Sequence, residues 1–175
     1  IANQTVNEGS LLTVTASGND PDVPANTLTY SLEPGAPPGM TINGSSGVLS
    51  WTPTEAQGPT TSPVTVRVSD SGVPSLSPTP TFNVTVNEVN SAPTLGVIAN
   101  QTVNEGSLLT VTASGNDSDM PANTLTYSLE PGAPAGMTIN ASSGVVSWTP
   151  TEAQGPSTSP VTVRVSDSGS PPLSD

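Results

Sequence analysis

The sequence predicts an all-β protein built from two tandem β-sandwiches, and three observations lead to this prediction. The 175 residues include 16 glycines and 20 prolines, which favour turns and interrupt helices. Apolar residues alternate with serine and threonine in short blocks, which is the period of a β-strand. Residues 1–78 and 98–175 align without a gap and differ at only nine positions. Repeats this long and this similar indicate a tandem array of small domains.

Seven blocks of the first repeat show the alternation and are bounded by turn residues. They are Gln4–Asn7, residues 11–17, residues 27–33, residues 40–43, Val48–Trp51, residues 63–70 and the segment that carries Phe82, Val84 and Val86. The sixth block is the clearest, because Val64, Val66 and Val68 alternate with the outward positions Thr65, Arg67 and Ser69. About seven short strands in each ~97-residue repeat predict a Greek-key β-sandwich of immunoglobulin-like size.

Two further inward faces follow from the same alternation. Leu12, Val14 and Ala16 share one face of the second block, and Leu28, Tyr30 and Leu32 share one face of the third. Because the chain has no cysteine, no disulfide can join the two sheets, so Trp51, Tyr30 and the valines are expected to form the core. Trp148 is expected to take the same core position in the second repeat.

The repeat sets the expected domains, which are residues 1–93 including the linker and residues 94–175. Ile1 opens in mid-pattern, so the chain is expected to be an excerpt of a longer array. The second copy stops before any counterpart of residues 81–88. Either the excerpt is cut there or that closing strand comes from elsewhere, and we favour the first interpretation.

The charge inventory argues against several functions. The chain has 14 acidic residues, two arginines (Arg67 and Arg164), no histidine and no cysteine, for a net charge of −12. Imidazole acid–base chemistry, thiolate nucleophiles and the usual zinc sites are therefore excluded, and no enzymatic activity is expected. With only two basic residues, the chain lacks the positive charge needed to bind nucleic acid or an anionic membrane. No stretch approaches the ~20 apolar residues of a transmembrane helix.

The acids gather at strand ends and not over the outward faces. In the first repeat they are Glu8, Asp20, Asp22, Glu33, Glu55, Asp70 and Glu88, and the second repeats them as Glu105, Asp117, Asp119, Glu130, Glu152 and Asp167. Carboxylates grouped without basic neighbours repel one another unless a cation joins them. Ca²⁺ prefers such a setting, with six to eight oxygen ligands. The alternative is that these acids are solvated turn residues that cap loop amides.

Several motifs then resemble a known family. DPDVPANTLTYSL, GVLSWTPTEAQ, VTVRVSDSGVPSLS and FNVTVNEVNSAPTL occur in the order of a cadherin-type repeat. GAPPGMTIN and GVLSWTPTEAQG are closer to the dystroglycan-type, cadherin-like immunoglobulin repeats of bacterial surface and secreted proteins. The resemblance covers essentially the whole chain and implies tandem immunoglobulin-like (cadherin-like) sandwiches.

The resemblance also implies a Ca²⁺ site at the junction between the repeats, since cadherins bind calcium there. Carried over residue by residue, the ligands of the complete junction are Glu8, Glu55, Glu88, Asn90, Asp117, Asp119, Asn123 and Asp167. By the same correspondence, Asp20, Asp22, Asn26 and Asp70 would face a preceding repeat. Glu105 and Glu152 would face a following one.

Two departures from the cadherin pattern lower the expected number of ions. Pro53 replaces an aspartate, and the linker at residues 88–93 is one residue short and lacks its second aspartate. One or two ions per junction are therefore expected in place of three. Eleven of the 14 acids nevertheless occupy motif positions, and only Glu33, Glu130 and Asp175 do not.

The expected function is that of an extracellular or cell-surface tandem repeat with a structural or adhesive role, as a stalk, adhesin or filament stiffened by calcium. Its expected partners are neighbouring repeats, with self-association into fibres or binding of surface glycans as further candidates. The alternative is a carbohydrate-binding or spacer module of a large secreted polysaccharide-degrading enzyme. An exposed row of aromatic side chains would favour that alternative. Arg67 and Arg164 are expected to pair across strands or to cover apolar surface.

Overall fold

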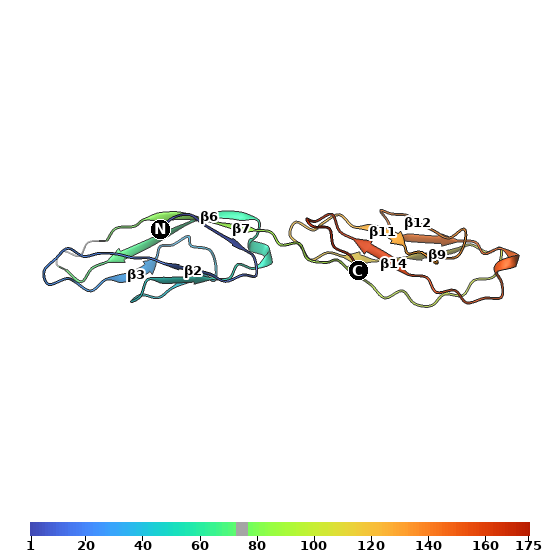
Figure 1. Ribbon diagram of the computed structural model, residues 1–175, viewed down its shortest axis with the longest axis horizontal. Helices are drawn as coiled ribbons and strands as arrows, with labels where there is room; N and C mark the ends of the chain where they lie inside the picture. The colour runs from blue at the N-terminus through green and yellow to red at the C-terminus, as the bar shows by residue number, and fades with distance from the viewer. Residues whose placement is uncertain (73–76) are drawn as a thin grey trace. The chain divides into compact units, whose positions relative to one another are not determined.

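A computed structural model describes residues 1–72 and 77–175 of the chain, which forms two compact units, Ile1–Val89 and Asn90–Asp175. Each unit contains β-strands and one short 3-10 helix (Figure 1). We describe the two units one after the other.

The first unit is a sandwich of two sheets. One sheet has the strand order β1-β7-β6-β3 and the other β2-β5-β4. Strands β1 and β7 are parallel, and every other pair in this unit is antiparallel. The elements are β1 (Gln4–Asn7), β2 (Leu12–Thr15), β3 (Thr29–Leu32), β4 (Thr41–Ile42), β5 (Val48–Trp51), the 3-10 helix η1 (Glu55–Gln57), β6 (Thr60–Ser69) and β7 (Thr81–Asn87).

The core of the first unit lies between these sheets and follows the predicted alternation. Val64, Val66 and Val68 of β6 are buried, at 0%, 0% and 8% exposure. Phe82 and Val84 of β7 are buried beside them, at 3% and 0%. The opposite sheet contributes its buried side chains Leu12, Leu49 and Trp51. The predicted inward faces of the first repeat are thereby confirmed.

The second unit uses the same plan with shorter strands. Its sheets are β12-β13-β9, β11-β14 and β10-β8. The elements are β8 (Thr94–Leu95), β9 (Leu109–Thr112), β10 (Gly115–Asn116), β11 (Thr126–Leu129), β12 (Thr138–Ile139), β13 (Val145–Trp148), the 3-10 helix η2 (Glu152–Gln154) and β14 (Val163–Ser166).

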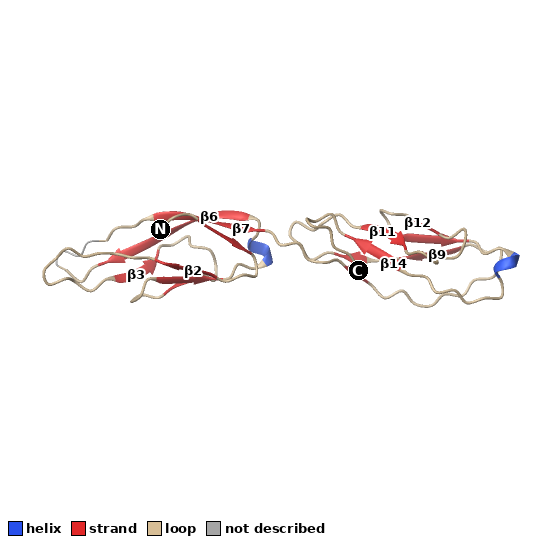
Figure 2. Cartoon of the chain, in the orientation of Figure 1, coloured by secondary structure: helices blue, strands red, loops and turns tan. Residues whose placement is uncertain are grey.

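Two strands of the first unit are lost or shortened in the second. Residues 101–104, the counterpart of β1, are fully described and form no strand, and Figure 2 shows this segment as loop. The counterpart of the ten-residue β6 is the four-residue β14. Both β1 and β6 pair with β7 in the first unit. The two differences therefore concern the two segments that pair with β7 in the first unit.

The core of the second unit is correspondingly small. Its buried cluster consists of Ala113, Tyr127 and Val165, with Leu95, Leu125, Ile139 and Val163 packed against it. Trp148 is only half-buried, whereas its counterpart Trp51 is 2% exposed. The tryptophan is therefore a fully buried core residue in the first unit, as predicted, and only a half-buried one in the second.

The architecture confirms the predicted fold class of tandem immunoglobulin-like, cadherin-like β-sandwiches. Among the described residues, no helix is long and apolar enough to cross a membrane.

Candidate metal-binding clusters

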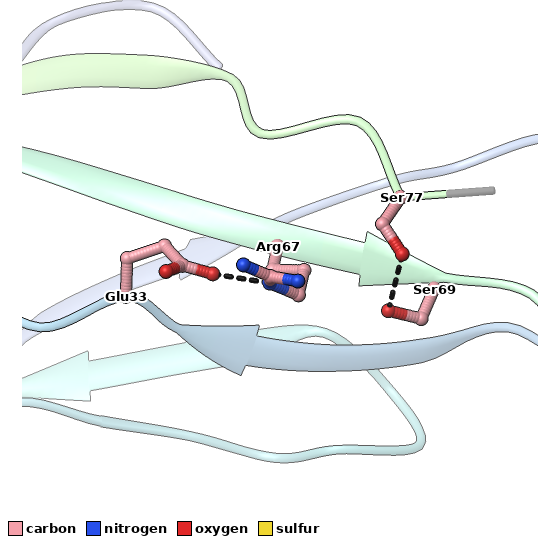
Figure 3. A network of polar contacts seen from close by, with 4 residues as sticks. All are labelled: Glu33, Arg67, Ser69 and Ser77. Atoms are coloured by element: carbon pink, nitrogen blue, oxygen red, sulfur yellow. Dashed lines mark hydrogen bonds and ion pairs between the residues drawn. The ribbon is translucent and has the colours of Figure 1, made fainter.

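Both arginines of the chain form ion pairs away from the acidic loops. Arg67 on β6 donates from Nε to Oε1 of Glu33, which follows β3, and Arg164 pairs with Glu130 in the same way. Figure 3 shows the first pair beside the Ser69–Ser77 hydroxyl contact, whose oxygens lie 3.0 Å apart. The predicted cross-strand pairing of the arginines is confirmed. The remaining acids therefore have no basic side chain in the chain to neutralise them.

The hydrogen bond from Arg67 lowers the pKa of Glu33 below its ordinary value, although partial burial opposes the shift. The same bond raises the pKa of Arg67. Glu33 and Glu130 are two of the three acids outside the cadherin-like motif. The third, Asp175, accepts a hydrogen bond from the Leu95 amide at 2.7 Å through Oδ2. Each acid outside the motif therefore has an identified structural partner.

A first acidic cluster forms at one end of the first unit, from Glu8, Glu55 and Glu88. One carboxylate oxygen of each lies within 4.8 Å of the others. Glu8 directly follows β1 and Glu88 directly follows β7. Because these two strands are parallel and in register, their carboxyl-terminal ends lie side by side at the same end of the sheet. Glu55 opens the 3-10 helix η1, where the Gln57 side chain caps the Thr54 amide at 2.9 Å.

The electrostatics of this cluster favour a cation. Three carboxylates at this spacing repel one another by roughly 3 kcal/mol for each pair at an effective dielectric of about 20. Glu8 is only 7% exposed. Its Oε1 accepts a hydrogen bond from the Val89 amide at 2.9 Å. Its Oε2 is buried and has no hydrogen-bond partner among the residues that the structure describes. A buried carboxylate oxygen with an open lone pair is a suitable ligand for a hard cation such as Ca²⁺.

A second cluster lies in the second unit and is centred on two buried aspartates, Asp119 (2% exposed) and Asp167 (6% exposed). Asp119 accepts hydrogen bonds from the Ser91 amide at 3.1 and 3.2 Å and from Nδ2 of Asn123 at 2.6 Å. Asp117 lies in the same loop as Asp119 and Asn123, and its Oδ1 accepts hydrogen bonds from their backbone amides at 3.1 and 3.0 Å. The loop that follows β10 is thus folded around its own carboxylates.

Asn90 bonds directly to Asp167 and is linked to Asp119 through the side chain of Asn123. Its Nδ2 donates to both oxygens of Asp167, at 3.2 and 3.1 Å, and its Oδ1 accepts from Asn123 at 2.9 Å. Burial of Asp167 raises its pKa, but hydrogen bonds from the Leu173 amide, the Asn90 side chain and the Gly169 amide outweigh burial and lower the pKa below its ordinary value. Asp167 is therefore held as a carboxylate.

The donor set of the second cluster also fits calcium. Asp117, Asp119 and Asp167 supply carboxylate oxygens, and Asn90 and Asn123 supply amide oxygens, which are the groups Ca²⁺ prefers. Oδ2 of Asp117 is buried and has no hydrogen-bond partner in the described part of the chain. As in the first cluster, a carboxylate oxygen is left available inside a group of acids.

Three contributors to the second cluster were missed by the sequence analysis, namely the amides of Ser91, Gly169 and Leu173. Backbone donors have no side-chain signature, so only Gly169 left a readable signal. A Cβ at that position would overlap the side chain of Asn90. A glycine two residues after a predicted ligand aspartate is thus required where Asn90 packs.

The other predicted ligands are not gathered in the same way. Asp22 is exposed and Asp20, Asn26 and Asp70 are half-buried. Their loops contain local hydrogen bonds, such as Asn26 Nδ2 to Asp22 at 2.9 Å and the Gly72 amide to Asp70 at 3.0 Å. Glu105 and Glu152, the counterparts of Glu8 and Glu55, are both exposed.

Comparison with known proteins places the sequence in a family. The family model described as "Putative Ig domain" matches residues 1–87 and again residues 92–173. No curated protein sequence gives a significant match.

Solved cadherin ectodomains share the fold. The chain matches human CDH23 EC21-23 at 24% identity and a TM-score of 0.62, covering 99% of this chain and 58% of that one. It matches the protocadherin gamma B2 extracellular cadherin domains 1-5 at 19% identity and a TM-score of 0.60, covering 99% of this chain and 36% of that one. For mouse cadherin-23 EC22-24 the identity is 20% and the TM-score 0.54, with coverage of 98% and 58%. The chain spans less than two thirds of each of these structures.

Proposed function

Since the chain belongs to the Putative Ig domain family, as two tandem copies of that domain, we propose that it is a structural and adhesive segment of an extracellular protein, stiffened by calcium between its two units. The proposal concerns an array whose immediate partners are neighbouring repeats of the same kind. The likeness of the fold to cadherin ectodomains supports the extracellular setting.

One observation carries the calcium proposal, the buried and unpartnered Oε2 of Glu8 beside two further glutamates. In water each of these carboxylates would be solvated, but here Glu8 is removed from solvent and the chain supplies no basic side chain to neutralise it. A divalent cation would offset both the repulsion among the carboxylates and the lost solvation of Glu8, because it neutralises their charge and is coordinated by the open lone pair.

The chain connects the two clusters through a very short segment. Glu88 belongs to the first cluster and Asn90 to the second, and only Val89 separates them. The Cα atoms of residues two apart cannot lie more than about 7 Å from each other. Fixing residues 88–91 on both sides would remove most torsional freedom from the linker, which is how calcium would convert a flexible pair of domains into a stiff one.

The test is thermal unfolding of the 175-residue chain in excess EGTA and in 10 mM CaCl₂, for the wild type and for Glu8→Gln. If calcium binds with a dissociation constant of about 10⁻⁴ M, as in many extracellular modules, it stabilises the folded state by about 2.7 kcal/mol at that concentration. We expect the melting temperature to rise by several degrees in the wild type and by much less in Glu8→Gln. In EGTA the variant should be at least as stable as the wild type, because it relieves the repulsion within the cluster.

The repeat offers a matched control. Glu105→Gln makes the same change at the counterpart residue, which is exposed and has no counterpart of Glu88 beside it. Its calcium response should equal that of the wild type. An equal response from Glu8→Gln and the wild type would refute the role of Glu8. Stiffening itself is measured by ¹⁵N relaxation, since the rotational correlation times of the two units should converge on addition of calcium.

The structure offers little support for the carbohydrate-binding alternative. Of the five aromatic residues, Tyr30, Trp51, Phe82 and Tyr127 are buried, and Trp148 is half-buried. Trp51 and Trp148 each donate their indole N–H to a backbone carbonyl, of Pro38 at 3.1 Å and of Ala135 at 3.2 Å. These side chains pack in the interior of the sandwiches and do not form an exposed row of rings on which a sugar could stack.

A further inference from the structure

The turn between β4 and β5 contains the only asparagine of the chain that is followed by a glycine, Asn43 before Gly44. The Asn43 side chain is exposed. Its Oδ1 accepts hydrogen bonds from the amides of Ser45 and Ser46, at 3.0 and 2.9 Å. Asparagine is favoured in turns because its side chain can bond to the backbone that follows it. The turn therefore accounts for the asparagine, but these bonds do not account for the glycine.

The fold does not require a glycine at position 44. Gly44 is not among the glycines with a positive φ, so its backbone conformation is open to other residues. A Cβ at Gly44 would meet the Tyr30 carbonyl oxygen at 3.5 Å and Cγ2 of Thr29 at 4.0 Å, which are ordinary van der Waals contacts. The second unit has an alanine, Ala141, at the same position.

The turn of the second unit is otherwise the same. Asn140 is exposed, as Asn43 is. Its Oδ1 accepts the amides of Ser142 and Ser143 at 3.0 and 2.9 Å, and its carbonyl accepts the Gly144 amide at 2.9 Å. These distances equal those of the first turn. The two turns therefore differ by one methyl group, on the residue that follows the asparagine.

That methyl group bears on a reaction of the asparagine with its own backbone. The amide nitrogen of Gly44 attacks Cγ of Asn43, so that an N–Cγ bond forms and the Cγ–Nδ2 bond breaks. Nδ2 leaves as ammonia with the proton of the Gly44 amide, and water then opens the five-membered imide to aspartate or isoaspartate. The attack is intramolecular, which gives the nitrogen a high effective concentration. Glycine places no Cβ beside the attacking nitrogen, whereas alanine does.

The surroundings of Asn43 suit this reaction. Two amide donors at about 3 Å from a carbonyl oxygen stabilise the negative charge that the oxygen acquires during attack. The Gly44 amide, which is the nucleophile, donates to neither Oδ1 nor the carbonyl of Asn43. Because Asn43 is exposed, ammonia can leave and water can enter.

We propose that Asn43 is a modification site at which the chain deamidates spontaneously, with water as the only co-reactant, and that Asn140 is spared by Ala141. Aspartate adds a negative charge to the turn. Isoaspartate adds a methylene group to the backbone between two hydrogen bonds, from the Gly47 amide to the Asn43 carbonyl and from the Tyr30 amide to the Gly44 carbonyl, both 2.9 Å. The first unit would thus change slowly and irreversibly with age. The inference is independent of calcium and of the proposed function.

The test is incubation of the folded 175-residue chain at 37 °C and pH 8, followed by peptide mapping with mass spectrometry. Conversion of the amide to a carboxyl group adds about 1 Da to the peptide that contains Asn43. We expect Asn140 to react at least about tenfold more slowly, because of the methyl group beside the nucleophile. The rate at Asn43 should rise with pH, since the deprotonated amide nitrogen is the attacking group. Isoaspartate is measured with a methyltransferase specific for that residue.

Two reciprocal variants keep the test decisive. Gly44→Ala should slow the reaction at Asn43 to the rate of Asn140, and Ala141→Gly should raise the rate at Asn140 to that of Asn43. Each variant copies the turn of the other unit, so both should fold, which circular dichroism checks. The proposal is overturned if the two asparagines of the wild type react at equal rates. It is also overturned if Gly44→Ala leaves the rate at Asn43 unchanged, or if Ala141→Gly does not raise the rate at Asn140.

Discussion

The two units differ at nine of 78 aligned positions, yet several identical residues are buried in one unit and exposed in the other. The first unit has its closing strand, so Glu8 and the β6 valines are buried, while Asp22 at the far loop is exposed. The second unit has a preceding linker, so Asp119 and Asp167 are buried, while Glu105 and Val161 are exposed. Identical residues thus take different environments in the two units, and the sequence of a repeat alone does not decide the burial of its side chains.

The largest expected difference between the units lies in their cores. Val64→Ala removes two fully buried methyl groups and should destabilise the first unit by roughly 2 kcal/mol, from lost transfer energy and the cavity left behind. Val161→Ala, the same change at an already exposed position, should cost less than about 1 kcal/mol. Urea unfolding followed by hydrogen exchange of each unit measures both values. Equal costs would contradict the difference in burial between Val64 and Val161.

A smaller difference is expected at the glycine behind the ligand aspartate. Gly169→Ala should displace Asn90 from Asp167, because the added Cβ would overlap the Asn90 side chain. Loss of these hydrogen bonds should destabilise the second unit by about 1–2 kcal/mol. At Gly72 the nearest atom to an added Cβ is Nδ2 of Asn26 at 3.2 Å, so Gly72→Ala should have little effect. Thermal unfolding of the two variants tests this prediction. A Gly72→Ala effect as large as that of Gly169→Ala would show that the loop, and not Asn90, sets the cost.

The smallest expected effect concerns a feature that both units share, the arginine–glutamate pair. Arg67 lowers the pKa of Glu33 below the ordinary value of 4.5. Because the folded-state pKa is the lower one, the ionised pair stabilises the first unit fully above about pH 4.5 and loses this contribution as the pH falls through the folded-state value. The effect should be small, since Arg67 is 46% and Glu33 25% exposed. Urea midpoints between pH 7 and pH 3 should fall less steeply in Glu33→Gln than in the wild type. Parallel curves would mean that the pair contributes nothing to stability.

Much of the fold could be predicted because the strands show a local alternation of apolar and polar residues. Gln4–Asn7 and Val48–Trp51 form strands with the predicted bounds, and the predicted faces of β6 and β7 are correct. The start of β6 at Thr60 could not be predicted, since residues 60–62 join the strand through their pairing with β7 and not through their own apolar pattern. The loss of strand at residues 101–104 has the same origin, because their sequence equals that of β1 and only the pairing partner differs.

The candidate sites were less accessible to sequence reasoning. Glu8 and Glu88 follow strands and Glu55 opens a 3-10 helix, far apart in the chain, and their spacing alone gives no sign that they meet. Their grouping was implied by the family resemblance, and the structure brings their carboxylates together. That they and the second cluster bind calcium stays a prediction. The Ser91 and Leu173 amides of the second cluster left no trace in the sequence, because any residue except proline can provide a backbone donor.

The position of the two arginines has a consequence for proteolysis. The chain contains no lysine, so Arg67 and Arg164 are its only sites for trypsin, one in each unit. Each lies within a paired strand, β6 or β14, where the backbone cannot enter a protease cleft without local opening. Cleavage after Arg67 therefore reports opening of the first unit and cleavage after Arg164 opening of the second. The ratio of the two cutting rates therefore compares directly how readily the two units open.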